Sequence, residues 1–147
     1  MAEPLSQINI GNFTLTIPTG WEINTDEEVL AVIKSDNGVG TIQISSYYID
    51  AHTPFDLFNE FHELVSETLA IPLEKSWAND IKLLRDNFLV FEAANPTDNR
   101  FFIIGFCEHN RSILFLTYNC SLDDKDLEYK DVHLFFKNIT FNDIAST

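Results

Sequence analysis

The chain has 147 residues, the usual length of one domain, and its composition of 45% hydrophobic and 13% aromatic residues excludes a disordered protein. Its 23 acidic residues against 9 basic ones give a net charge of −14. A negative field of this size repels nucleic-acid phosphates and anionic lipid surfaces, so we expect neither nucleic acid nor membrane among the partners. The same field favours encounter with a basic protein, although a dense negative surface also serves solubility.

The sequence shows no address for export or for a membrane. No apolar run reaches the roughly 20 residues that span a bilayer. Residues 1–6 lack the basic and apolar regions of a signal peptide. We therefore expect a cytoplasmic protein.

The two cysteines lie on two expected strands that a short turn joins. With a two-residue turn, Cys107 faces Ser112, about eight pair positions or roughly 27 Å from Cys120 at ~3.3 Å per residue. A disulfide needs Cα atoms within about 7 Å of each other. We therefore predict two free thiols, which suit a reducing compartment.

The first third of the chain alternates apolar and polar residues, the period of a half-buried strand. This pattern predicts strands at residues 13–17, 21–23 and 40–49, and the short apolar run at residues 29–33 predicts another. The turn signal Asp36-Asn37-Gly38 separates the last two. We predict an antiparallel meander here.

An amphipathic helix follows. Thr53 suits its N-cap, Pro54 suits its first position, and Pro72 ends it. One apolar stripe recurs at helical spacing and consists of Leu57, Phe58, Phe61, Leu64, Val65 and Leu69.

A second strand group occupies residues 81–84, 88–94, 101–107 and 112–119. The strands of its long hairpin are apolar on both faces, which indicates that both faces are covered. Two arrangements satisfy this pattern. The two helices lie on opposite faces of the sheet, or one face of the hairpin packs against a second copy in a homodimer.

The last helix is predicted to begin near Leu122, with Ser121 or Asp123 as its cap. Asp123, Asp124 and Asp126 then fall in its first turn, where the helix dipole favours anions. Its inner face consists of Leu127, Val132, Phe135, Phe136 and Ile139. No repeat or linker interrupts the chain, so we predict one α+β domain over residues 1–147, a mainly antiparallel β-sheet with two amphipathic helices.

Two local patterns resemble those of the PsbP-like superfamily. One is an opening strand closed by a Pro-x-Gly-Trp turn, residues 13–21, and the other is the closing helix with Phe135, Phe136, Ile139 and Phe141. The resemblance implies an α/β/α sandwich with helices on both faces of a central sheet. The superfamily includes photosystem subunits, small-GTPase-binding proteins and many uncharacterised bacterial domains, so the resemblance by itself implies no single function.

No catalytic, cofactor or metal motif stands out in the sequence. The acids Asp124, Asp126 and Glu128 have the spacing of a calcium loop but lack its glycine and its final glutamate. Glu92 and Glu108 lie on strands that bury aromatic residues, and we interpret them as edge positions that face solvent. His133 is expected on the outer flank of the last helix.

We therefore predict a non-enzymatic protein-binding domain, for instance a bacterial immunity-type or accessory protein that binds a basic partner. Its candidate contacts are two groups of acids, namely Asp26, Glu27 and Glu28, and Asp123, Asp124, Asp126, Glu128 and Asp131. The alternative is a small-molecule-binding or enzymatic domain with a pocket between sheet and helix. Its candidate pocket aromatics are Trp21, Tyr47 and Trp77.

Overall fold

Two antiparallel sheets dominate the computed structural model, which describes residues 6–24, 30–68, 81–95 and 97–142. Within these ranges the elements run in chain order as β1 (Ser6–Ile10), β2 (Phe13–Ile17), β3 (Trp21–Asn24), β4 (Leu30–Lys34), β5 (Gly40–Tyr48), α1 (Leu57–Thr68), β6 (Lys82–Arg85), β7 (Phe88–Asn95), β8 (Arg100–His109), β9 (Ser112–Ser121), the 3-10 turn η1 (Leu122–Asp124), α3 (Tyr129–Lys137) and β10 (Thr140–Phe141).

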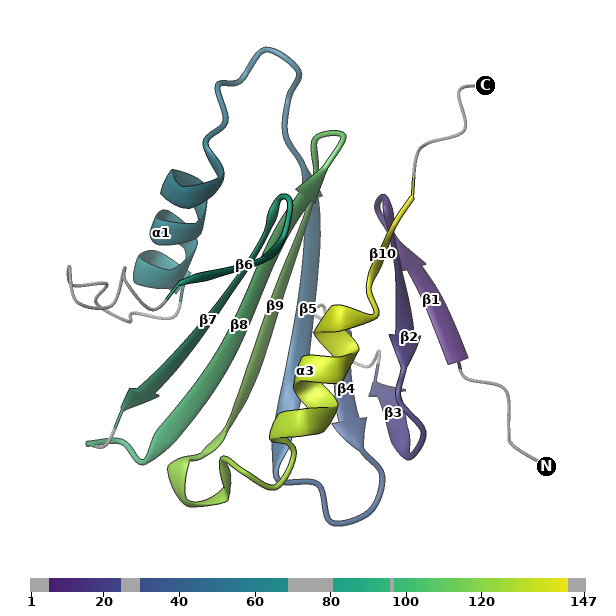
Figure 1. Ribbon diagram of the computed structural model, residues 1–147, viewed down its shortest axis with the longest axis vertical. Coiled ribbons are helices and arrows are strands. Elements are labelled where there is room, and N and C mark those ends of the chain that lie inside the picture. The colour runs from purple at the N-terminus through teal and green to yellow at the C-terminus, as the bar shows by residue number, and fades with distance from the viewer. Residues whose placement is uncertain (1–5, 25–29, 69–80, 96, 143–147) are drawn as a thin grey trace.

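The larger sheet has the strand order β3-β4-β5-β9-β8-β7-β6, and the smaller has the order β1-β2-β10. Helix α1 lies on one face of the larger sheet, whereas α3 and the smaller sheet lie on the other (Figure 1). The predicted α+β class and the helices on opposite faces are confirmed. The predicted meander is confirmed for β3-β4-β5 and is wrong for its first strand, because β2 pairs with β1 and β10 in the smaller sheet. The smaller sheet was not predicted, and it makes one outer layer a mixture of helix and strand.

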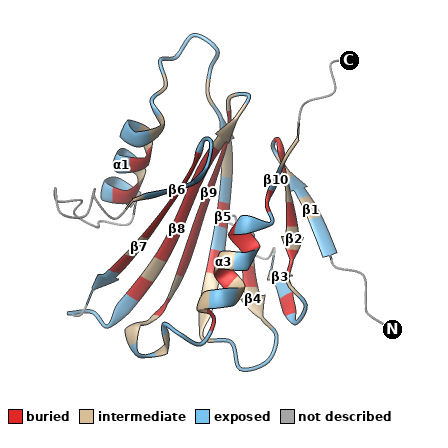
Figure 2. Cartoon of the chain, viewed as in Figure 1, coloured by how far each residue is buried: buried red, intermediate tan, exposed pale blue. Residues whose placement is uncertain are grey.

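Each face of the large sheet carries its own hydrophobic core. Alternate residues of β8 and β9 point to opposite sides, so Ile103 and Leu114 join the core beneath α3, whereas Ile104 and Ile113 join the core beneath α1. The central strands are accordingly buried along most of their length (Figure 2). This burial within one chain accounts for the doubly apolar pattern of the hairpin without a second copy, and a homodimer stays a prediction.

The β8–β9 hairpin turns at Asn110 and Arg111, which both have positive φ, 50° and 70°. The turn places Cys107 opposite Leu114 rather than Ser112, so the predicted register is wrong by two residues. Cys120 is then six positions along the strand (120 − 114), about 20 Å at ~3.3 Å per residue. Both thiols are free and buried, and burial raises the pKa of the Cys107 thiol. Cys107 is therefore a core residue.

Helix α1 begins three residues later than Pro54. The Arg111 guanidinium donates to the carbonyls of Asp50, Ala51 and Thr53 and holds this segment as a loop. Asp56 provides the cap in place of Thr53, because its side chain accepts from the Asn59 N–H at 3.1 Å. The predicted end at Pro72 lies outside the described residues.

The last helix also begins later than predicted. Residues Leu122–Asp124 form one 3-10 turn, Ser121 makes no side-chain capping bond there, and α3 starts at Tyr129. Leu127 therefore precedes the helix and is 65% exposed, whereas Val132, Phe135, Phe136 and Ile139 are buried as predicted. No helix within the described residues is long and apolar enough to cross a bilayer.

Candidate functional site

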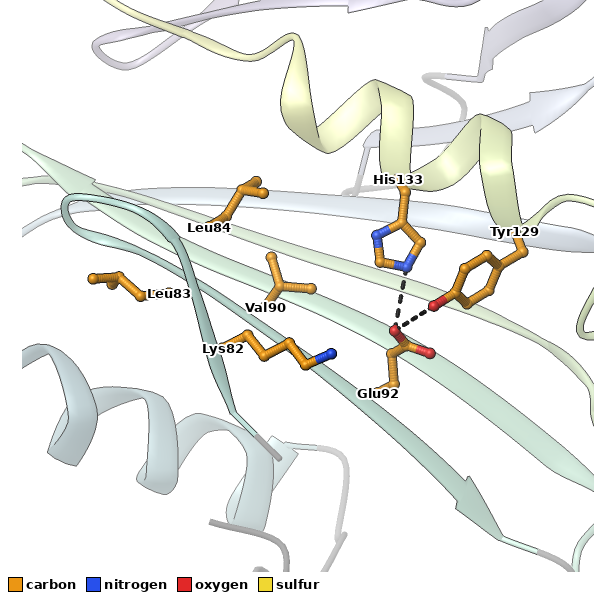
Figure 3. Close-up of a pocket in the computed structure, with 7 residues that line it drawn as sticks. All are labelled: Lys82, Leu83, Leu84, Val90, Glu92, Tyr129 and His133. Atoms are coloured by element: carbon orange, nitrogen blue, oxygen red, sulfur yellow. Dashed lines mark hydrogen bonds and ion pairs between the residues drawn. The ribbon is translucent and has the colours of Figure 1, made fainter. Parts of the chain in front are cut away.

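A pocket of about 650 Å³ opens between the β6–β7 hairpin and α3 (Figure 3). Its walls combine three apolar side chains with four that carry a charge or a hydrogen-bonding group. They are Lys82, Leu83, Leu84, Val90, Glu92, Tyr129 and His133. The pocket therefore joins an aliphatic surface to a small polar cluster.

The alternation of β7 creates the polar cluster. Leu89, Phe91 and Ala93 pack beneath α1, so Val90 and Glu92 point to the α3 side. Tyr129 and His133 are four residues apart on α3 and share one helix face, with ring centroids 4.4 Å apart. That face lies over Glu92, as Figure 3 shows.

Both side chains of α3 meet the same carboxylate oxygen. The Tyr129 hydroxyl donates to Glu92 Oε2 at 2.7 Å, and His133 Nε2 lies 3.3 Å from that oxygen. The hydrogen bond to Glu92, with burial as a second cause, raises the pKa of Tyr129 to about 12. His133 Nε2 is itself buried and is not aligned as a hydrogen bond to Glu92, so its contact is electrostatic and becomes an ion pair when the imidazole is protonated.

The cluster can bind ligand groups that are charged or that form hydrogen bonds. It offers a carboxylate, a phenol, an imidazole and, at the rim, the amine of Lys82. Over the described ranges, no three His, Cys, Asp or Glu residues come together in a way that could hold a metal ion.

Glu128, one of the predicted contact residues, is structural. It is 2% exposed, and its carboxylate accepts from Tyr118 Oη at 2.9 Å and from the Gly40 and Val39 N–H groups at 3.0 and 3.2 Å. A Cβ on Gly40 would come within 2.6 Å of Asn119 O, so the close approach of β5 to β9 at this position needs glycine. Its prediction as a surface contact is wrong, because the carboxylate joins α3 to the start of β5.

The other acids of this group remain accessible. Asp123 and Asp126 are exposed, and Asp124 and Asp131 are half-buried. Asp131 accepts a long bond of 3.4 Å from Trp21 Nε1. The second predicted group, Asp26, Glu27 and Glu28, lies outside the described residues.

Two of the predicted pocket aromatics, Trp21 and Tyr47, lie on opposite sides of the large sheet. Trp21 is 7% exposed within the core beneath α3, whereas Tyr47 packs at the core beneath α1 and donates to Glu60 Oε1 at 3.1 Å. Burial, with Glu60 as the second cause, raises the pKa of Tyr47. The sheet separates these two residues, so they line no common pocket. Trp77 lies outside the described residues.

The sequence interpretation missed the pocket although it considered two of its residues. Glu92 is 33% exposed beneath Tyr129 and His133, so its interpretation as a solvent-facing edge residue is wrong. Glu108 instead lies next to the β8–β9 turn, where its carboxylate accepts from the Arg111 N–H at 2.9 Å. The signal in the sequence that could have revealed the pocket is Glu92 itself, a single acid in the apolar strand β7.

Comparison with known proteins shows the fold. No protein-family model matches the chain, and no curated protein matches its sequence. Among solved structures, the cyanobacterial PsbP of Synechocystis sp. PCC 6803 is similar with a TM-score of 0.61 at 10% identity, over 93% of this chain and 92% of that one. The chain therefore has the PsbP-like fold that the resemblance implied.

Other structures agree. LpqN, described as involved in cell envelope biogenesis of Mycobacterium tuberculosis, matches with a TM-score of 0.60 at 12% identity, over 96% of this chain and 87% of that one. A variant of the protein Mog1 matches with a TM-score of 0.57 at 8% identity, over 97% of this chain and 98% of that one. A Bacteroides thetaiotaomicron protein matches with a TM-score of 0.61 at 11% identity, over 92% of this chain. This chain spans only 47% of that longer protein.

Proposed function

We propose that this chain is a non-enzymatic binding domain whose partner is a basic protein. The observation that carries the proposal is the acidic segment at residues 123–131, where Asp123 and Asp126 remain exposed in a chain of net charge −14. Complementary charge accelerates encounter and selects partners, more than it adds affinity. A bacterial immunity-type protein that neutralises a basic toxin is a concrete version of this function.

A paired substitution tests whether the acidic segment itself binds. The variant Asp123→Asn/Asp126→Asn and the control Glu63→Gln/Glu67→Gln each remove two exposed charges, and the control pair lies on α1. Captures from a cell extract are compared by mass spectrometry at low and high salt, and each candidate is then titrated in purified form.

The expected result is a basic partner that wild type and the α1 control bind, with salt-sensitive association, and that the segment variant binds more weakly. Equal losses in both variants would mean that net charge alone attracts the captured protein. That result, or the recovery of no basic partner at low salt, contradicts the proposal.

The pocket beside α3 favours a second candidate, a small-molecule-binding domain. A screen of ligands by thermal unfolding distinguishes the two candidates, because a ligand that binds the folded state raises the midpoint by mass action. A compound that raises the midpoint of wild type but not of Glu92→Gln would support this second function.

A further inference from the structure

Among the described residues, only one of the two oxygens of the Glu92 carboxylate has partners. Tyr129 and His133 both approach Oε2. Among the described residues, Oε1 has no hydrogen bond and no ion pair. A carboxylate oxygen that is partly shielded from water and has no partner favours a cationic ligand group.

The walls around this carboxylate fit a long side chain with a charged end. Val90 and Leu84 provide aliphatic surface on the sheet side, and the ring of Tyr129 lies beside the carboxylate on the helix side (Figure 3). Aliphatic surface suits the methylene stem of arginine or lysine, and an aromatic ring attracts a guanidinium at its face.

The charges around the pocket favour a cation over an anion. Lys82 and His133 are the basic residues in the described lining, and Lys82 is exposed on the edge strand β6, whereas His133 lies against Glu92 Oε2. Glu92 is more enclosed, at 33% exposed, and Asp126 is close enough to contribute to the raised pKa of Tyr129. With a net charge of −14, the surrounding field also disfavours an anionic ligand.

We propose that the pocket between β6–β7 and α3 receives an arginine side chain of the basic partner, with Glu92 Oε1 as its counter-ion. The inference rests on the proposed function, because it assumes a basic protein as the partner. It identifies one anchoring position within that interface. Such an anchor contributes more to binding than the exposed charges around it, because it is partly desolvated.

The test is a titration of the isotope-labelled protein with two short peptides, followed by NMR. One peptide is acetylated and amidated with a central arginine, and the other carries citrulline, a neutral isostere, at the same place. The arginine peptide should shift the signals of Tyr129 and His133 saturably. The citrulline peptide should bind at least about fivefold more weakly, because it lacks the charge.

Three variants establish which groups bind the peptide. Glu92→Gln should weaken the arginine peptide at least about fivefold, and Lys82→Gln should tighten it, because a competing cation is removed. Glu67→Gln on α1 removes the same charge as Glu92→Gln at an exposed site and should leave the affinity unchanged. Circular dichroism confirms that each variant is folded.

The outcomes separate this inference from the proposed function. If the arginine peptide shifts only signals near Asp123 and Asp126, and Glu92→Gln has no effect, the pocket inference is wrong and the acidic-segment proposal stands. If Lys82→Gln weakens binding and Glu92→Gln tightens it, the pocket binds anions. If neither peptide shifts the pocket signals, the pocket inference fails, and the capture experiment decides the proposed function independently.

Discussion

Two glutamates on the α3 side of the large sheet differ in what surrounds them. Glu128 is 2% exposed and accepts three hydrogen bonds, two of them from the backbone at the start of β5. Glu92 is 33% exposed and uses one oxygen for Tyr129 and His133. A buried carboxylate that the chain itself satisfies holds the fold together, whereas a carboxylate with an unused oxygen beside a pocket can bind another molecule.

The substitution Glu128→Ala should have the largest effect. It leaves two backbone N–H groups and the Tyr118 hydroxyl without their acceptor, and we expect a loss of about 3 kcal/mol in the free energy of unfolding. Urea unfolding followed by circular dichroism measures this change. The control Glu67→Ala on α1 should change stability by less than about 0.5 kcal/mol. Similar losses in the two variants would show that Glu128 has no structural role.

The substitution Glu92→Gln should have a smaller effect on stability. The side chain is partly exposed, and the amide retains an oxygen that can accept from Tyr129, so we expect a change below about 1 kcal/mol. The same urea unfolding experiment measures it. A loss as large as that of Glu128→Ala would mean that both glutamates are structural and would remove the contrast between them.

The last expected effect appears only at high pH and concerns the titration of Tyr129. Its hydrogen bond to Glu92 raises the pKa of Tyr129 from 10.0 to about 12. Because the pKa is raised in the folded state, the associated stability is fully present below pH 10.0 and is lost as the pH rises through about 12. Glu92→Gln should lower this pKa towards 10.0, as NMR of ring-labelled tyrosine would measure.

The control for this titration is Tyr129→Phe. The difference in stability between wild type and this variant should decrease over the same pH interval, because the other tyrosines titrate in both proteins. An unchanged difference would indicate that the Tyr129 hydroxyl does not interact with Glu92 in solution.

The sequence predicted the parts of the fold that local pattern determines. The alternation at residues 13–17 predicts β2 with its observed bounds, and the doubly apolar hairpin predicts a sheet covered on both faces. It did not predict β1 or β10. The two-residue strand β10 has no periodicity of its own, and its pairing with β2 depends on tertiary structure.

The candidate site was harder to predict for a similar reason. By residue type alone Glu128 looks like another surface acid, and nothing near it in the sequence reveals the backbone N–H groups of Val39 and Gly40, which lie almost ninety residues earlier. Tyr129 and His133 show helical spacing, but their contact with Glu92 depends on how α3 packs on the sheet. Contacts of this kind depend on how elements distant in the sequence pack together, rather than on local sequence preferences.

The pairing of β2 with β10 has a consequence for synthesis on the ribosome. Thr14 pairs with Thr140, Phe13 packs edge-on against Phe141 with ring centroids 5.3 Å apart, and Asn142 N–H donates to Asn12 O. Arg85 also reaches this strand, since it donates to Ile139 O and lies over the Phe141 ring. The edge of β2 that receives β10 therefore stays without its strand partner until translation has passed Phe141, and a nascent chain shorter than this leaves a hydrogen-bonding edge open to other chains.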